Sequence, residues 1–259
     1  MMIENNVDRG LIIRRQENLR SEEYAKMCAD SLDTCNMKFE YIDAVQNVSY
    51  EQAANEAGLE YNPEIHEKSK DLKDSIYHHK ECMEMGNSCC TASHVKAWRR
   101  IVEIDKPCAI LEHDAIVLKN FRNFEIPDDY LVHLGPRMRD LKRYVPKSRV
   151  RAMIGIPQAI GTHAYAVTPK TAQKLIDGME EHGMVYGVDH YLFLSNASGI
   201  PIAAPDPYPA ICWSRESTMA DTTENNPGFR GVWQGQNDQN VPAQITPGLV
   251  EGLGCPMHG

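Results

Sequence analysis

The chain has 259 residues, of which 42% are hydrophobic and 24% are charged, which is typical of a soluble globular protein. Its formal net charge of −9 argues against general binding to nucleic acids or anionic membranes, because both favour a basic surface. No apolar run reaches about 18 residues, so we expect no transmembrane segment. The N-terminal residues also lack the apolar core of a signal peptide. We therefore predict a cytoplasmic α/β protein whose eight cysteines stay reduced.

The first part of the chain predicts a strand, a helix and a second strand. The apolar run Gly10–Ile13 is typical of a buried strand, and the polar stretch 18–36 that follows it is typical of a surface helix. Residues 38–44 alternate as a second strand that ends near an aspartate. This order within about forty residues is how a doubly wound sheet begins. A short helix with Gly58 near its end is expected next.

The central stretch 89–118 predicts a helix followed by a strand buried on both faces. Thr91 is expected to cap the helix, and Pro107 ends the turn after it. The unbroken apolar run Cys108–Leu111 is typical of a strand covered on both faces. One apolar face at helical spacing is formed by Ala92, Val95, Trp98, Ile101 and Val102.

Two acidic residues, Glu112 and Asp114, follow the central strand directly. Extended backbone places alternate side chains on one face, so both carboxylates can point the same way. Ligands of open α/β sheets bind beyond the carboxyl ends of the strands. Hard cations such as Mg²⁺ and Mn²⁺ prefer oxygen ligands, which indicates a metal site. The alternative is a strand end that turns into solvent.

The second half of the chain predicts further strands and one helix. Strands are expected at Tyr130–Leu134 and Gly161–Val167, and Thr168-Pro169 opens a helix that ends at Gly183. Between the strands lies the segment Arg137–Arg151, which is strongly basic in an acidic chain. This segment is either a solvated loop or a basic segment that faces an anionic ligand.

Asp189 enters an apolar run and is either the cap of a short helix or a catalytic acid or base. From about Asp221 the chain is rich in Asn, Gly, Gln and Pro and shows no periodicity. We therefore predict a catalytic domain over residues 1–220 and a largely irregular tail over residues 221–259.

Two blocks of residues resemble glycosyltransferase family 25, which includes bacterial lipopolysaccharide galactosyltransferases and collagen hydroxylysine galactosyltransferases. The first block is SHVKAW at Ser93–Trp98 followed by ILEHDAIVL at Ile110–Leu118. The second is GTHAYAVTPKTAQKLI at Gly161–Ile176, followed by the aspartate of VDHYL. The family's Leu-Glu-Asp-Asp is Leu-Glu-His-Asp here, so His113 departs from the pattern while both outer acids remain.

The resemblance implies a GT-A-like fold, with a Rossmann-type, mostly parallel sheet flanked by helices. It implies inverting transfer of a hexose, such as galactose or glucose, from a UDP-sugar to a hydroxyl of a glycan or other acceptor. Lipopolysaccharide biosynthesis is the expected setting, and the basic segment favours an anionic acceptor. Asp114 would be the main ligand of Mn²⁺ or Mg²⁺, with Glu112 acting through water or on the ribose, and His163 or His190 would be a further ligand. Asp189 would be the base, and its apolar neighbours could raise its pKa.

Four further residues are expected to contact the nucleotide sugar. Ser93 and His94 would lie in the first turn of the central helix, where backbone N–H groups are free to bind phosphate. Arg15 and Asp43 follow the first two strands. Two other functions remain open: a metal-dependent phosphotransferase or hydrolase, and an inactive nucleotide-sugar-binding relative, for which His113 is the only indication.

Overall fold

The computed structural model describes residues 6–67, 80–135, 150–152, 161–184, 187–194, 197–205 and 208–212. Within these residues a seven-stranded sheet has the order β2-β1-β3-β7-β5-β8-β6. β7 runs antiparallel to β3 and β5, and β6 runs antiparallel to β8, so the other five strands share one direction. The strands are β1 (Arg9–Arg14), β2 (Lys38–Asp43), β3 (Cys108–Glu112), β5 (Leu131–His133), β6 (Val150–Ala152), β7 (Ala164–Val167) and β8 (Ile202–Pro205).

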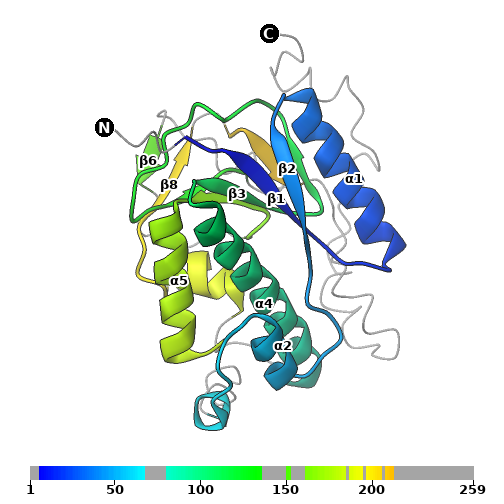
Figure 1. Ribbon diagram of the computed structural model, residues 1–259, viewed down its shortest axis with the longest axis vertical. Helices are drawn as coiled ribbons and strands as arrows, with labels where there is room; N and C mark the ends of the chain where they lie inside the picture. The colour runs from blue at the N-terminus through cyan, green and yellow to red at the C-terminus, as the bar shows by residue number, and fades with distance from the viewer. Residues whose placement is uncertain are drawn as a thin grey trace, which may run out of the picture.

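Helices cover both faces of this sheet. α1 lies on one face, and α2, α4 and α5 lie together on the other (Figure 1). Their bounds are α1 (Leu19–Thr34), α2 (Tyr50–Glu56), α4 (Lys80–Ile104) and α5 (Pro169–His182), and a short π-helix, η2, spans His190–Leu194. The predicted α/β class, with a mostly parallel sheet flanked by helices, is confirmed.

The strand sequences explain why two hydrophobic cores form. In β1, Leu11 and Ile13 pack toward α2, α4 and α5, whereas Ile12 between them packs toward α1. β3 alternates in the same way, with Ile110 on the first side and Leu111 on the second. Because helices cover both faces of the sheet, both alternating sets of side chains in these strands are apolar. This is the pattern from which the buried strand at Cys108–Leu111 was predicted.

α4 corrects the predicted start of the central helix. Thr91 does not cap it, because α4 begins eleven residues earlier at Lys80. The Thr91 hydroxyl instead donates to the Asn87 carbonyl oxygen at 2.8 Å, the i−4 bond that threonine makes inside helices. Trp98 is fully buried, and Ala92, Val95 and Ile101 share its core, so the predicted apolar face is confirmed.

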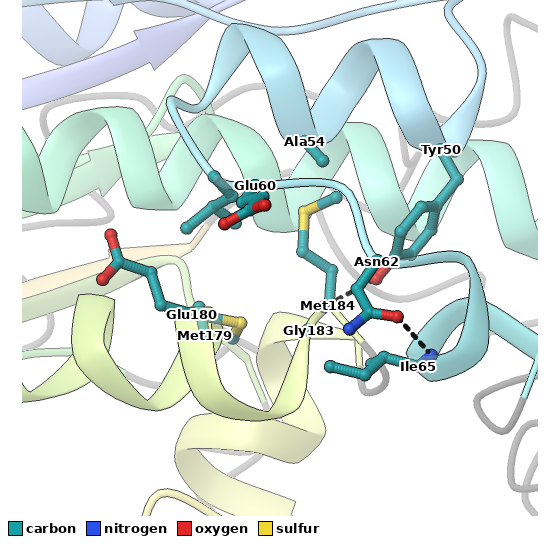
Figure 2. Close-up of a pocket in the computed structure, with 10 residues that line it drawn as sticks. Tyr50, Ala54, Glu60, Asn62, Ile65, Met179, Glu180, Gly183 and Met184 are labelled. Carbon is teal, nitrogen blue, oxygen red and sulfur yellow. Dashed lines mark hydrogen bonds between the residues drawn. The ribbon is translucent and has the colours of Figure 1, made fainter.

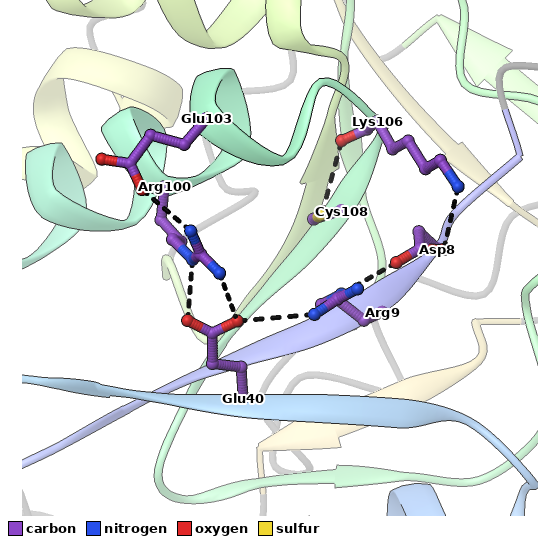
Figure 3. Close-up of polar contacts among 7 residues, drawn as sticks. All are labelled: Asp8, Arg9, Glu40, Arg100, Glu103, Lys106 and Cys108. Carbon is purple, nitrogen blue, oxygen red and sulfur yellow. Dashed lines mark hydrogen bonds and ion pairs between the residues drawn. The ribbon is translucent and has the colours of Figure 1, made fainter.

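An ion-pair network joins β1, β2 and α4 (Figure 3). Glu40 accepts from Arg100 at 2.8 Å and from Arg9 at 3.5 Å, and Arg9 also donates to Asp8 at 2.8 Å. Hydrogen bonds from Arg100 to Glu40 and Glu103 raise the pKa of the Arg100 guanidinium. Pairs near the surface each contribute only about 0–1 kcal/mol, so each contact of this network adds little to the stability of the fold.

A second, two-stranded sheet extends from the end of β3. β4 (Ala115–Val117) pairs with β9 (Ala210–Cys212), and Ala115 lies opposite Cys212. Most of the predicted basic segment, residues 136–149, and the predicted tail, residues 221–259, lie outside the described residues. No helix among the described residues is long and apolar enough to cross a membrane.

Candidate functional site

The candidate site lies at the carboxyl end of β3. Ile13 of β1 is in register with Glu112, so the two strands end at the same edge of the sheet, where ligands of such sheets bind. His113 and Asp114 form a turn between β3 and β4. The backbone at Asp114 is therefore not extended, so the predicted reason for the alignment of Glu112 with Asp114 is wrong. The two carboxylates nevertheless contact the same side chain.

That partner is His163, which lies just before β7. Its Nδ1 is 3.2 Å from Glu112 Oε2 and 3.7 Å from Asp114 Oδ1. Although burial disfavours the imidazolium, Cys212, Glu112 and Asp114 raise the pKa of His163 well above its usual value. Burial likewise opposes the charge on Glu112, but His163 and His94 lower the pKa of its carboxyl well below the usual range. The two carboxylates therefore stabilise a positive charge on the buried imidazole of His163.

Asp114 has a second neighbour that the sequence did not predict. The Cys212 thiol lies 3.2 Å from Asp114 Oδ2, because the pairing of β4 with β9 places residue 212 beside the turn. Burial and the adjacent Asp114 raise the pKa of Cys212 to about 11. The sequence predicts only that the cysteines stay reduced, and no local motif relates residues 98 positions apart.

Asp189 also belongs to this site. Its Oδ1 accepts from the Thr162 backbone N–H at 2.9 Å and lies 3.0 Å from the Thr162 hydroxyl. The same hydroxyl lies within hydrogen-bond distance of Glu112 Oε1, so Thr162 bridges the two acids. The Asp189 carboxylate bonds to Thr162, which belongs to another segment, and not to the N–H groups of its own helix. This contact disfavours the alternative that Asp189 is a helix cap. Thr162 was missed because the sequence analysis treated it only as part of a strand.

His94 joins the two motif blocks through Tyr165. The Tyr165 hydroxyl accepts from Trp98 Nε1 at 2.8 Å and lies 2.8 Å from His94 Nδ1. Because the tryptophan N–H can only donate, the hydroxyl proton is available for His94 Nδ1. This network places the His94 proton on Nε2, which points at Glu112 Oε1 from 3.6 Å. His94 and Trp98 of the first block therefore share the tyrosine of the second block as a hydrogen-bond partner.

Replacing Tyr165 by phenylalanine should destabilise the protein by about 1–3 kcal/mol, because two buried ring nitrogens lose their partner. Chemical denaturation measures this loss. Tyr191→Phe is the matched control, since the buried Tyr191 hydroxyl makes a single, longer bond of 3.3 Å to the Leu175 carbonyl oxygen. Equal losses in the two variants would contradict the role of Tyr165 as a shared hydrogen-bond partner.

Ser93 and His94 do not lie in the first turn of their helix, so the predicted reason for phosphate binding there is wrong. α4 begins at Lys80, and the backbone N–H groups of both residues lie inside it. The Ser93 hydroxyl donates to the Cys89 carbonyl oxygen at 2.7 Å and accepts from Val45 N–H at 2.9 Å. We therefore assign Ser93 to joining α4 with the segment after β2.

Arg15 and Asp43 lie at the same edge of the sheet, beyond β1 and at the end of β2. Asp43 accepts from Arg14 at 3.1 Å and from Gln16 at 2.7 Å, and Arg15 donates to Gln46 at 3.0 Å. β1 is the neighbour of β3, and β2 is the next strand, so these side chains lie near the candidate site. Their contact with a nucleotide stays a prediction.

Two groups of potential metal ligands occur among the described residues. One is Cys90, His94 and Glu112, and the other is Asp114, His163 and Cys212. His163 is thus placed beside Asp114, as predicted for a late histidine, whereas His190 belongs to neither group. Burial lowers the pKa of His190, with Asp189 opposing. His113 stacks on Tyr24 of α1 at a ring distance of 6.0 Å.

Gly161 controls the position of His163. Its φ is +120°, and a Cβ there would lie 2.4 Å from the His163 ring. Gly161→Ala should therefore displace His163 and weaken metal binding, which calorimetric titration measures. Gly199→Ala is the control, because φ is +65° there but no heavy atom lies within 4 Å of the added Cβ. It should lose only about 1–2 kcal/mol from backbone strain, with metal affinity retained. Equal metal affinity in both variants would contradict this prediction.

A surface pocket elsewhere contains none of the predicted site residues. It lies between α2, the segment after it and α5, and its lining includes Tyr50, Glu60, Asn62 and Met179 (Figure 2). The Asn62 side chain accepts from Ile65 N–H within this pocket. The cluster at the end of β3 therefore remains the candidate site, because it holds the convergent charged groups.

Comparison with known proteins bears on this site. No curated protein matches the sequence. A solved structure of a glycosyltransferase involved in the glycosylation of the major capsid of PBCV-1 is similar, with 10% identity over 82% of this chain and 96% of that one. The TM-score between the two chains is 0.38. The model of glycosyltransferase family 25 (LPS biosynthesis protein) matches residues 12–133, which include Glu112 and Asp114. The resemblance carried by the first motif block, Ser93–Leu118, is thus confirmed: over residues 12–133 the chain matches glycosyltransferase family 25.

Proposed function

We propose that this protein is an inverting, metal-assisted glycosyltransferase that moves galactose or glucose from a UDP-sugar to a hydroxyl of a glycan. The family match supports glycosyl transfer as the reaction class and lipopolysaccharide biosynthesis as the setting. The observation that carries the proposal is the meeting of Glu112, Asp114, His163 and Asp189 at the carboxyl end of the sheet. A cytoplasmic location and a domain boundary near residue 220 stay predictions.

The divalent cation would be held mainly by Asp114 and His163. Asp114 Oδ1 is buried and has no hydrogen-bond partner among the described residues, which leaves a ligand position there. Glu112 would bind through water or hold the ribose, because it groups with His94 rather than with Asp114. A bound divalent cation acts as a Lewis acid on the diphosphate leaving group.

Asp189 would remove the proton of the acceptor hydroxyl. Inversion takes place by a single displacement, in which the acceptor oxygen attacks the anomeric carbon and the nucleoside diphosphate leaves. Asp189 Oδ1 is held by Thr162, which leaves Oδ2 for the acceptor. Through Thr162 the proposed base is fixed relative to Glu112, and therefore to the donor side of the site.

The test is a screen of UDP-galactose, UDP-glucose and other nucleotide sugars, with and without added divalent metal. A bound donor raises the unfolding temperature by mass action, and release of nucleoside diphosphate reports turnover. Metal-dependent release with one donor supports the proposal. Donor binding without turnover would instead favour an inactive binding relative, and no response to any nucleotide sugar would contradict both.

A metal-dependent phosphotransferase or hydrolase is the second candidate. The observation that favours it is the presence of two adjacent ligand groups, since His163 of one group contacts Glu112 of the other. Paired metal sites about 3.5–4 Å apart are common in phosphatases and nucleases. Cleavage of simple phosphate esters in the same screen, without any response to nucleotide sugars, would select this function.

A further inference from the structure

Three buried side chains from different segments meet at the turn after β3. Asp114 comes from the turn itself, His163 from the segment before β7, and Cys212 from the end of β9. All three residues are at most 8% exposed. One potential ligand atom from each lies within 4.8 Å of the other two. Such a set of oxygen, nitrogen and sulfur donors is unlike the oxygen-only ligands that Mg²⁺ prefers.

The spacing within this group fits a small tetrahedral site. The Cys212 sulfur is 3.2 Å from Asp114 Oδ2, and His163 Nδ1 is 3.7 Å from Asp114 Oδ1. With metal–ligand bonds of about 2.0–2.3 Å, tetrahedral geometry separates neighbouring ligand atoms by roughly 3.3–3.5 Å. The sulfur and the nitrogen approach different oxygens of Asp114, so a rotation of the carboxylate and small side-chain movements would bring one atom of each residue around a cation.

We propose that Cys212 is a ligand of the divalent cation, beside Asp114 and His163, and that the site prefers Zn²⁺ or Co²⁺ to Mg²⁺ and Mn²⁺. The proposal rests on the metal site proposed above but not on glycosyl transfer. It changes the expectation of Mn²⁺ or Mg²⁺, because a thiolate is a soft ligand. On binding, the Cys212 thiol and the His163 imidazolium each give a proton to solvent, and the thiolate sulfur and the freed ring nitrogen bond to the metal.

Glu112 has a defined place in this arrangement. Its Oε2 lies 3.2 Å from His163 Nδ1, so Glu112 holds the Nδ1 proton in the metal-free site, and this contact must open before Nδ1 can bind the cation. A competing location exists at Cys90, His94 and Glu112, where a thiol is also present. An experiment must therefore detect a sulfur ligand and also show whether that ligand is Cys212 or Cys90.

Titration of the full-length protein with Co²⁺ gives the required signal, because thiolate ligation produces a charge-transfer absorption band in the near ultraviolet. We expect this band in the wild type and in Cys90→Ser, and its loss in Cys212→Ser. Cys108→Ser is the matched control, since Cys108 is buried at the other end of β3. Removing a residue that only orients a metal ligand lowers metal affinity by about 10–100-fold. Because Cys212 is proposed as a direct ligand, Cys212→Ser should lower the affinity for Co²⁺ by at least about tenfold.

Cys212→Asp tests the preference for Zn²⁺ or Co²⁺ over Mg²⁺, because it replaces the sulfur ligand by an oxygen ligand. An oxygen donor at this position should abolish the band and shift the affinity ratio toward Mg²⁺, measured by competition against Co²⁺. The proposal is overturned if the band persists in Cys212→Ser, if it disappears only in Cys90→Ser, or if no band forms in the wild type. Because none of these readouts uses a sugar donor, failure of the proposed transferase activity leaves them unaffected.

Discussion

Replacing Asp189 by asparagine should lower kcat by about 10²–10⁴-fold, the usual contribution of a positioned general base. The asparagine oxygen can still accept from the Thr162 N–H, so the local structure and donor binding should be retained. The amide cannot take a proton, which means that the loss should appear in kcat and not in the Kd of the donor. Steady-state kinetics with the donor identified above, together with a binding titration, measures the two quantities separately.

Asp177→Asn provides the matched control for this prediction. Asp177 is an exposed residue of α5 whose carboxylate accepts only a local bond, 2.7 Å from Gln173, so its replacement should leave kcat unchanged. A pH profile adds a second criterion: the limb that reports ionisation of the base should disappear in Asp189→Asn alone. Wild-type kcat in that variant would remove Asp189 from the mechanism.

The sequence predicted the fold well wherever neighbouring residues determine it. The buried strand at Cys108–Leu111 and the proline-initiated helix at Pro169 follow from local patterns, and both form as expected. The start of α4 could not be predicted in this way. Thr91 has the chemistry of a cap, but its hydroxyl bonds within the helix, which begins eleven residues earlier at Lys80.

The candidate site was predictable only in part. Glu112, Asp114, His163 and Asp189 were named from motifs, and the structure brings them together. Cys212 could not be named, because its place depends on the register of β9 against β4. The sequence also does not predict the direction in which a side chain points. His190 is adjacent to Asp189 but belongs to neither ligand group, although the residues themselves gave no reason to separate it from His163.

Replacing Asp114 by asparagine should abolish most metal-dependent turnover. The amide is a weaker ligand than a carboxylate and carries no charge, so metal affinity should fall by at least about 10–100-fold. The concentration of metal that gives half-maximal rate should rise accordingly, and excess metal should restore part of the rate. Metal titrations of turnover and calorimetric binding measure both effects in the same preparation.

Two comparisons distinguish a ligand from a residue that only supports the fold. Asp129→Asn removes a carboxylate that is paired at the surface with Lys170 at 2.9 Å, and it should change neither metal affinity nor rate. Glu112→Gln should reduce turnover with a smaller loss of metal affinity than Asp114→Asn, because Glu112 lies in the other ligand group. If Asp114→Asn keeps the wild-type dependence on metal concentration while remaining folded, Asp114 is not the ligand. The cation would then have to bind at Cys90, His94 and Glu112, where the same titration of Glu112→Gln would show the larger loss.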